Sequence, residues 1–212
     1  MRREQRLVFG EVAEMYDRHR PAYPDVVVDD LVEMAGLSPG SSVLEIGAGT
    51  GKATSMFAAR GMHVVAVEPS EEMAAVARRV CAAYDSVRIE QGDFERWDPS
   101  GRVFPLVFAA QAWHWLDPAV GFAKAAQVLR PGGVLAAFWN RPMWVRAALR
   151  EVLIDAYRRA APEVLDESDP MHPANSPSGD ETRWRDGRQG RLHARRFISV
   201  AYHSPRDSVL DK

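Results

Sequence analysis

Short apolar runs alternate with helix-like stretches along most of the chain. Five of the runs have the length of a strand, at 43–46, 63–67, 87–91, 103–110 and 134–139. Stretches with helical spacing lie before, between and after them, at 6–18, 25–35, 52–60, 71–84, 117–129 and 143–160. Strands that alternate with helices in this way predict right-handed crossovers and a mostly parallel sheet with helices on both faces. The sequence therefore predicts a doubly wound α/β fold.

The 212 residues fit a single domain with three parts. Residues 1–40 are expected to form an N-terminal helical cap, in which Pro21 and Pro24 force an extended link between two helices. These helices precede the first strand and are expected to cover the carboxyl ends of the strands, where open α/β sheets bind ligands. Residues 41–140 are the predicted core. In 141–212 we expect a helix, a lid-like loop over 162–191 and one further strand at 197–202.

Charge and cysteine usage narrow the class of protein. The formal net charge of −2 gives no electrostatic argument for binding nucleic acid or an anionic membrane. The single cysteine, Cys81, argues against a disulfide framework and favours a reducing compartment. No stretch has the apolar length of a signal peptide or a membrane span. We therefore predict a cytoplasmic protein with no membrane or nucleic-acid partner, and we predict no metal site.

A glycine turn follows the first strand directly and is the clearest chemical signal in the sequence. Gly47, Gly49 and Gly51 stand at alternate positions, which suits a sharp turn with positive φ and lets a ligand approach the main chain. The turn leads into a helix N-terminus with unpaired N–H groups. The spacing is not that of a dinucleotide or P-loop phosphate motif, because residues 52 and 53 are Lys and Ala. Glu45, two residues before the turn, would repel a pyrophosphate and suits a cationic ligand.

Acidic residues follow the second and third strands. Glu68 ends the second strand and is placed to accept hydrogen bonds from both hydroxyls of a ribose. Asp93 and Phe94 follow the third strand, where the carboxylate can accept from an adenine amino group while the ring packs on the base. Two plainer interpretations stay open, a solvated carboxylate for Glu68 and a turn Asp with a core Phe for the pair.

Further motifs follow the glycine turn in a fixed order. They are VVAVEPSEEMA, IEQGDFE, QAWHWLD and LRPGGVLAAFWN, and the turn itself reads Glu-x-Gly-x-Gly-x-Gly. Together these motifs resemble those of the class I S-adenosylmethionine-dependent methyltransferases, in the family's order and spacing. The opening FGEVAEMYDRHRPAYP resembles a small-molecule subgroup that includes trans-aconitate methyltransferase-like proteins. The resemblance covers roughly 9–202 and implies a Rossmann-like fold, S-adenosyl-L-methionine as the cofactor and a small-molecule acceptor.

The resemblance also implies roles for individual residues. Those that would face the methionine and ribose portion are Gly47, Ala48, Gly49 and Gly51. Glu45 would steady the α-amino end, and Glu68 would bind the ribose diol. The adenine would lie among Pro69, Ser70, Met73, Asp93 and Phe94. Gln111, Ala112 and His114 would lie beside the sulfonium, and Tyr16 and Arg20 would close over the carboxylate, with the guanidinium well suited to pair with it.

Two departures from the family pattern stand out. Pro105 replaces an Asp that usually enters the fourth strand, which removes no ligand. The family fold also ends with a seventh, antiparallel strand, and the chain stops at Lys212 after one predicted strand beyond the fifth. We therefore expect the C-terminal hairpin to be incomplete and the protein to be a shortened version of a longer one.

Methyl transfer from an activated sulfonium needs alignment and exclusion of water more than acid–base chemistry. A carboxylate acceptor needs no base, whereas for a hydroxyl or an amine His114 is the best-placed candidate. The alternative, that His114 only shapes the pocket, stays open. Two other functions also stay open: an S-adenosylmethionine-binding protein without catalysis, and a nicotinamide-dependent oxidoreductase, which lacks its third glycine and a hydride-transfer site here. The sequence does not predict the oligomeric state.

Overall fold

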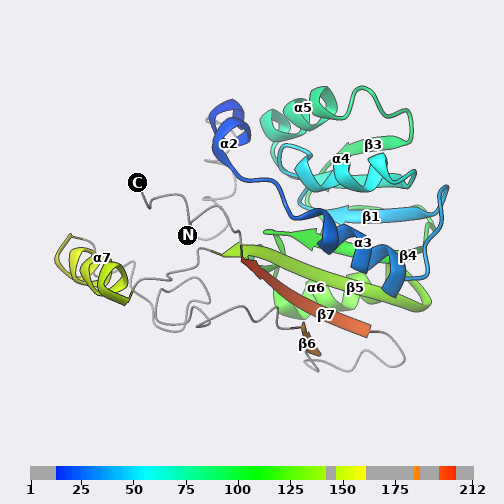
Figure 1. Cartoon of the computed structure of the whole chain (residues 1–212). Coiled ribbons are helices and arrows are strands. Elements are labelled where there is room, and N and C mark those ends of the chain that lie inside the picture. The colour runs from blue at the N-terminus through cyan, green and yellow to red at the C-terminus, as the bar shows by residue number, and fades with distance from the viewer. Residues whose placement is uncertain (1–12, 142–146, 161–183, 187–195, 204–212) are drawn as a thin grey trace. The chain divides into compact units, whose positions relative to one another are not determined.

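The computed structural model describes residues 13–141, 147–160, 184–186 and 196–203 (Figure 1). The chain divides into two compact units, one made of Met1–Trp139 with Trp184–Val200 and the other of Asn140–Arg183 with Ala201–Lys212. The first unit carries most of the sheet and every residue discussed below as part of a site. The helix α7 (Ala147–Ala160) belongs to the second unit and agrees with the helix predicted at 143–160. The organisation of 1–212 as a single domain stays a prediction.

The described elements follow the predicted order closely. The helices of the first unit are α2 (Ala13–His19), α3 (Asp25–Met34), α4 (Lys52–Ala59), α5 (Glu71–Val80), the short 3-10 helix η2 (Trp113–Trp115) and α6 (Pro118–Val128). The strands are β1 (Ser42–Ile46), β2 (His63–Glu68), β3 (Val87–Gln91), β4 (Phe104–Ala110), β5 (Leu129–Arg141), β6 (Trp184–Asp186) and β7 (Arg196–His203). The part of the first predicted helix before residue 13 lies outside the described residues.

The sheet has the order β3-β2-β1-β4-β5-β7-β6. The strands β1 to β5 pair in parallel, with β1 between β2 and β4, whereas β6 and β7 are antiparallel. The direction in which successive strands are added therefore reverses between β1 and β4. In an open α/β sheet this reversal creates a crevice at the carboxyl ends of the strands, where ligands bind. The predicted doubly wound, mostly parallel architecture is confirmed.

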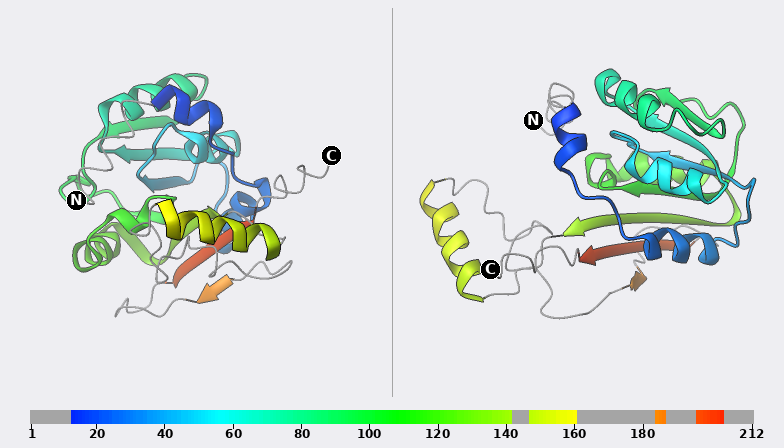
Figure 2. Two further views of the ribbon diagram at one scale, coloured as in Figure 1. Left: turned by 90° about the vertical axis from the view of Figure 1, so that its left-hand side faces the viewer. Right: turned by 45° about the horizontal axis from the view of Figure 1, so that its top comes forward.

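Alternate residues along the strands pack against helices on opposite faces of the sheet. Leu44 and Ile46 of β1 belong to a buried cluster that includes Ala125 and Val128 of α6. On the other face, Phe57 of α4 is fully buried, and its ring stacks on Phe108 of β4 with the centroids 4.2 Å apart. The strands of the sheet lie between α4 and α6 in the left view of Figure 2. This period-two alternation fixes the register and holds the carboxyl ends of the strands in place.

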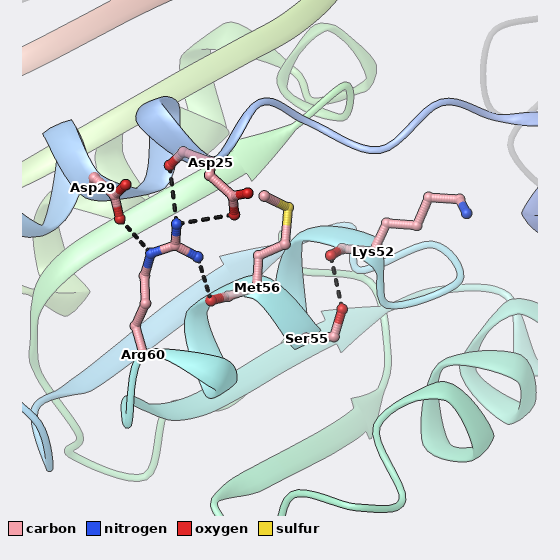
Figure 3. Close-up of polar contacts among 6 residues, drawn as sticks. All are labelled: Asp25, Asp29, Lys52, Ser55, Met56 and Arg60. Carbon is pink, nitrogen blue, oxygen red and sulfur yellow. Dashed lines mark hydrogen bonds and ion pairs between the residues drawn. The ribbon is translucent and has the colours of Figure 1, made fainter.

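The two N-terminal helices have different positions, and only one of them lies at the glycine turn. Arg60, at the end of α4, donates to the carboxylates of Asp25 (3.0 Å) and Asp29 (2.5 Å) of α3 and to the carbonyl oxygen of Met56 (3.0 Å) (Figure 3). These contacts hold α3 at the end of α4 that is remote from the turn. The expectation that both helices cover the carboxyl edge is therefore wrong for α3, which also buries its apolar residues Val27, Val28 and Leu31.

Three other differences from the prediction concern connections and edges. The stretch 92–103 between β3 and β4 contains no helix, so the alternation is interrupted once. The predicted turn at 130–133 lies inside β5 as a register shift, since Phe104 pairs with Leu129 and Leu106 pairs with Val134. The short strand β6 lies where we expected a loop, and it pairs with β7, which contains the strand predicted at 197–202. The chain thus supplies a seventh strand, and the prediction that it would be missing is wrong.

Candidate functional site

The glycine turn connects β1 to α4 at the point where the strand order reverses. Gly47, Gly49 and Gly51 have φ of +71°, +55° and +84°, as the sequence predicts. Each position needs glycine for a different reason. A Cβ at Gly47 would lie 2.5 Å from the Cβ of Ala112, and one at Gly51 would lie 3.1 Å from the Cα of Ala77. A Cβ at Gly49 would meet no atom within 4 Å, so this is the position where the turn is open to a ligand.

Glu68 joins the end of β2 to the glycine turn. Its Oε2 accepts from the backbone N–H of Gly49 at 2.8 Å, and its Oε1 accepts from the N–H of Ser70 at 3.0 Å. The side chain is buried, with 6% of its surface exposed, so the solvated interpretation is wrong. The Val67 carbonyl also accepts from the N–H groups of Gly47 (2.8 Å) and Ala48 (3.2 Å). The carboxylate that we predicted to bind a ribose therefore lies directly beside the open glycine.

Residues after β2 form the first turn of α5. Ser70 caps this helix, because its Oγ accepts from the N–H of Met73 at 3.2 Å, and Pro69 is half-buried beside it. The hydroxyl of Ser70 also donates to Glu72 at 2.8 Å, which lowers the pKa of that carboxyl group. Met73 is buried and packs with Ala13 and Val76. The predicted adenine-binding residues of this segment are thus next to Glu68 in space as well as in sequence.

Glu45 lies in the interior of the protein. It has 1% of its surface exposed, and its Oε2 accepts from the hydroxyl of Thr54 at 2.5 Å. The pKa of Glu45 is raised to about 8, chiefly by burial, with the Thr54 hydrogen bond lowering it and the negative charge of Glu68 raising it. Strand alternation places this side chain on the face that α4 covers. Its described partner is therefore a hydroxyl of α4, one turn beyond the glycines.

Asp93 and Phe94 follow β3 and adopt the plainer of the two arrangements considered above. The Oδ1 atom of Asp93 accepts from the N–H of Glu95 at 3.2 Å, within its own turn. Phe94 is 3% exposed and belongs to the core cluster, where its ring lies 6.3 Å from that of Trp97. A role in adenine binding stays a prediction for both residues.

The segment after β4 lies close to the glycine turn. Gln111 has φ of +60°, which is uncommon for a residue other than glycine, and its N–H donates to the Phe138 carbonyl at 2.9 Å. This conformation directs the chain so that Ala112 meets Gly47. Strained backbone held by its surroundings is frequent at functional sites. The contact between 47 and 112 brings the two predicted halves of the site together.

His114 lies in η2 and is exposed. Its Nδ1 accepts a hydrogen bond from the indole Nε1–H of Trp139 at 3.1 Å. Because an indole nitrogen only donates, this contact requires Nδ1 to be the unprotonated nitrogen. A proton taken up at Nδ1 would break the contact with Trp139. In the structure Nδ1 therefore acts as an acceptor, and a catalytic role for His114 stays a prediction.

The chain before α3 also reaches the crevice. Tyr23 packs edge-on against Phe138 of β5, with the ring centroids 5.0 Å apart, and Arg20 is exposed. Tyr16 lies in α2, and its side chain is outside the part of the chain that the structure describes. Sequence reasoning missed one ion pair here, in which Lys52 Nζ lies 3.1 Å from Asp17 Oδ1. A lysine at the first position of a helix interacts unfavourably with the positive end of the helix dipole, and this signal in the sequence could have indicated a nearby acidic partner.

Metal ligands, membrane helices and the cysteine were also considered within the described residues. No group of three or more His, Cys, Asp or Glu side chains there is arranged to hold a metal ion. No helix in the same part of the chain is long and apolar enough to cross a membrane. Cys81 is buried, and burial raises the pKa of its thiol to about 11, so it is a poor nucleophile.

The fold is a doubly wound α/β sheet whose strand order reverses between β1 and β4, with the glycine turn and Glu68 at that point. The sequence model of a family described as "Methyltransferase domain" matches residues 43–133. An uncharacterized methyltransferase of Mycobacterium tuberculosis is 42% identical over 149 residues, which are 68% of this chain and 58% of that protein. An uncharacterized methyltransferase of a Geobacillus species is 30% identical over 160 residues, 69% of this chain and 74% of that protein.

A solved structure gives the same result for the fold. A Methanococcus maripaludis protein provisionally assigned as an S-adenosyl-L-methionine-dependent methyltransferase superposes with a TM-score of 0.54 at 19% identity, over 76% of this chain and 73% of that one. The chain belongs to the class I S-adenosylmethionine-dependent methyltransferase family, whose cofactor is S-adenosyl-L-methionine. It spans about three fifths of the length of its mycobacterial relatives.

Proposed function

We propose that this chain binds S-adenosyl-L-methionine at the β1/β4 crevice and transfers its methyl group to a small-molecule acceptor by in-line displacement. One observation carries the proposal: a buried carboxylate, Glu68, is fixed beside Gly49, the single glycine of the turn whose Cβ position is open. A carboxylate in this position suits the two hydroxyls of a ribose. An open glycine beside it suits the close approach of the rest of the cofactor.

The residues of the turn fit the cofactor in charge as well as in shape. When bound, S-adenosyl-L-methionine supplies a sulfonium methyl that is already activated for transfer. Glu68 gives the turn negative character that a cationic ligand tolerates and a pyrophosphate does not. The N–H groups at the start of α4 are available to the polar end of the ligand, as at other helix N-termini.

The acceptor side of the site is formed by residues at the ends of β4 and β5. His114 and Trp115 have ring centroids 4.8 Å apart, and Trp139 donates to the histidine. Tyr23 lies against Phe138 on the neighbouring strand. We propose that this aromatic wall positions a small acceptor and excludes water from it, and that His114 orients the acceptor without removing its proton.

The choice of a small acceptor rests on charge and on the subgroup that the opening of the sequence resembles. A net charge of −2 gives no overall electrostatic attraction for a nucleic acid. We therefore propose that the methyl acceptor is a small molecule. We also propose that the protein acts in the cytoplasm. The buried, unpaired Cys81 agrees with a reducing compartment.

The proposal is tested by methyl transfer with labelled cofactor. The protein is incubated with S-adenosyl-L-methionine labelled on the methyl group and a panel of small carboxylic acids, phenols and amines, and labelled product is separated by chromatography. We expect at least one acceptor class to gain label, and we expect Glu68→Ala to remove the activity. Binding of the cofactor without label transfer to any acceptor would instead favour the non-catalytic binding protein.

A further inference from the structure

Helix α2 contacts α5 and the first residue of α4 along one side. Ala13 packs with Met73 and Val76 of α5 and is 5% exposed. Four residues later, Asp17 pairs with Lys52, the first residue of α4. Residues four apart lie on one face of a helix, so both contacts come from the same side of α2. Figure 1 and both views of Figure 2 show α2 beside α5.

The pair between Asp17 and Lys52 has an unusual electrostatic setting. Lys52 occupies the N-terminal end of a helix, where the macrodipole is positive and a cation is disfavoured. The negative charge of Asp17 is attracted both to the lysine ammonium and to the positive end of the helix, and it therefore stabilises both. The two side chains are 24% and 30% exposed, so the pair is less screened by solvent than most surface pairs. Figure 3 shows the Lys52 ammonium directed away from the Asp25, Asp29 and Arg60 cluster.

A second ion pair on α2 provides a contrast. Glu14 Oε1 lies 3.1 Å from Arg79 Nη2 of α5, but the side chains are 72% and 63% exposed. Exposed pairs of long side chains contribute little to stability. The two pairs join the same helix to the same unit, and they differ in exposure and in distance along the chain from the glycine turn. Lys52 follows Gly51 directly, whereas Arg79 lies in the last turn of α5.

We infer that Asp17 and Lys52 are positioning residues for the cofactor. Their ion pair fixes α2 to the start of α4, directly after the glycine turn that we propose to bind the cofactor. The pair acts through α2 and not by contact with the cofactor. This inference rests on the proposed function, since it deepens the account of how the same site binds S-adenosyl-L-methionine. It assigns to Lys52 a role that its place in the turn motif does not reveal.

The test is a calorimetric titration of S-adenosyl-L-methionine into the wild type and four variants of the full chain. We expect Asp17→Asn and Lys52→Met each to weaken binding about fivefold, and the exchange Asp17→Lys with Lys52→Asp to restore most of the affinity. The matched control, Glu14→Gln with Arg79→Gln, is expected to bind like the wild type. Circular dichroism of each variant checks that the sheet is intact.

Hydrogen exchange of the amides in 13–19 provides a second readout. We expect the cofactor to slow exchange there in the wild type, and to slow it much less in Asp17→Asn. Wild-type affinity in Asp17→Asn would overturn the inference. So would a loss in Lys52→Met that the exchanged pair does not restore, since that result would mean that Lys52 contacts the cofactor itself. Failure of the wild type to bind would count against the proposed function, which separates the two claims.

Discussion

Replacement of Glu45 by glutamine tests the electrostatics of the site interior. The carboxyl group is fully buried, and its pKa rises from 4.5 to about 8. Between these two values the folded protein keeps a proton at Glu45 that the unfolded chain releases. The folded state therefore binds more protons, and the free energy of unfolding falls as the pH rises from 4.5 to 8. The fall attributable to this one group is on the order of a few kcal/mol.

Glutamine removes the titration but keeps the contact with α4. Its amide oxygen can accept from the Thr54 hydroxyl as the carboxyl group does, at a distance that is 2.5 Å in the wild type. Glu45→Gln is thus expected to have a flatter pH profile and to be more stable than the wild type at pH 8, in the absence of cofactor. The exposed Glu33→Gln is the matched control and is expected to follow the wild type at every pH.

Urea unfolding followed by circular dichroism at pH 5, 6.5 and 8 measures the difference. Ionisable groups far from position 45 contribute equally in the three proteins, so the difference from the wild-type curve reports Glu45 and its immediate neighbours. If Glu45→Gln and the wild type lose stability in parallel between pH 5 and 8, the carboxyl group is not held neutral in the interior and the reasoning is refuted.

Two further predictions concern packing. Gly51→Ala should destabilise the protein by about 2–3 kcal/mol in urea unfolding, because φ is +84° and the new Cβ would lie 3.1–3.2 Å from atoms of Ala77 and Cys81. Gly36→Ala is the control, because φ is +59° there and the new Cβ would meet no atom within 4 Å; it should lower the unfolding free energy by only about 1–2 kcal/mol. An equal loss of unfolding free energy in the two variants would contradict the role of the contacts with Ala77 and Cys81. Phe57→Ala should lower the unfolding free energy by about 3–5 kcal/mol, since the ring is fully buried on Phe108; a loss below about 1 kcal/mol would argue against that packing.

Local patterns predicted the elements and their ends well. Helix ends depend on residues within a few positions of each other. Examples are the glycines with positive φ after α3 and α4, Gly36 and Gly61, and the helix caps at Ser70 and Asp117. The period-two and helical patterns are equally local, which is why the five parallel strands lie where they were expected. The end of α5 at Val80, several residues early, shows the usual uncertainty at helix ends.

What the sequence did not reveal depends on contacts between distant residues. Arg60 contacts Asp25 and Asp29 of α3, about thirty positions away. Asp17 and Lys52 meet across a similar separation, and Gly47 meets Ala112 across two strands. No spacing rule encodes such pairs. The role of Glu45 at the ligand stays a prediction, and its hydrogen bond to Thr54 was not foreseen because no local pattern says which helix covers its face of the sheet.

The central claim is that the β1/β4 crevice of this chain is a site for S-adenosyl-L-methionine. The most direct measurement is a calorimetric titration of the 212-residue chain with S-adenosyl-L-methionine and, separately, with NADH, with Glu68→Ala in parallel. We predict saturable binding of S-adenosyl-L-methionine, its loss in Glu68→Ala, and no heat with NADH. Binding of NADH, or no binding of S-adenosyl-L-methionine by a chain that circular dichroism shows to be folded, would contradict the account.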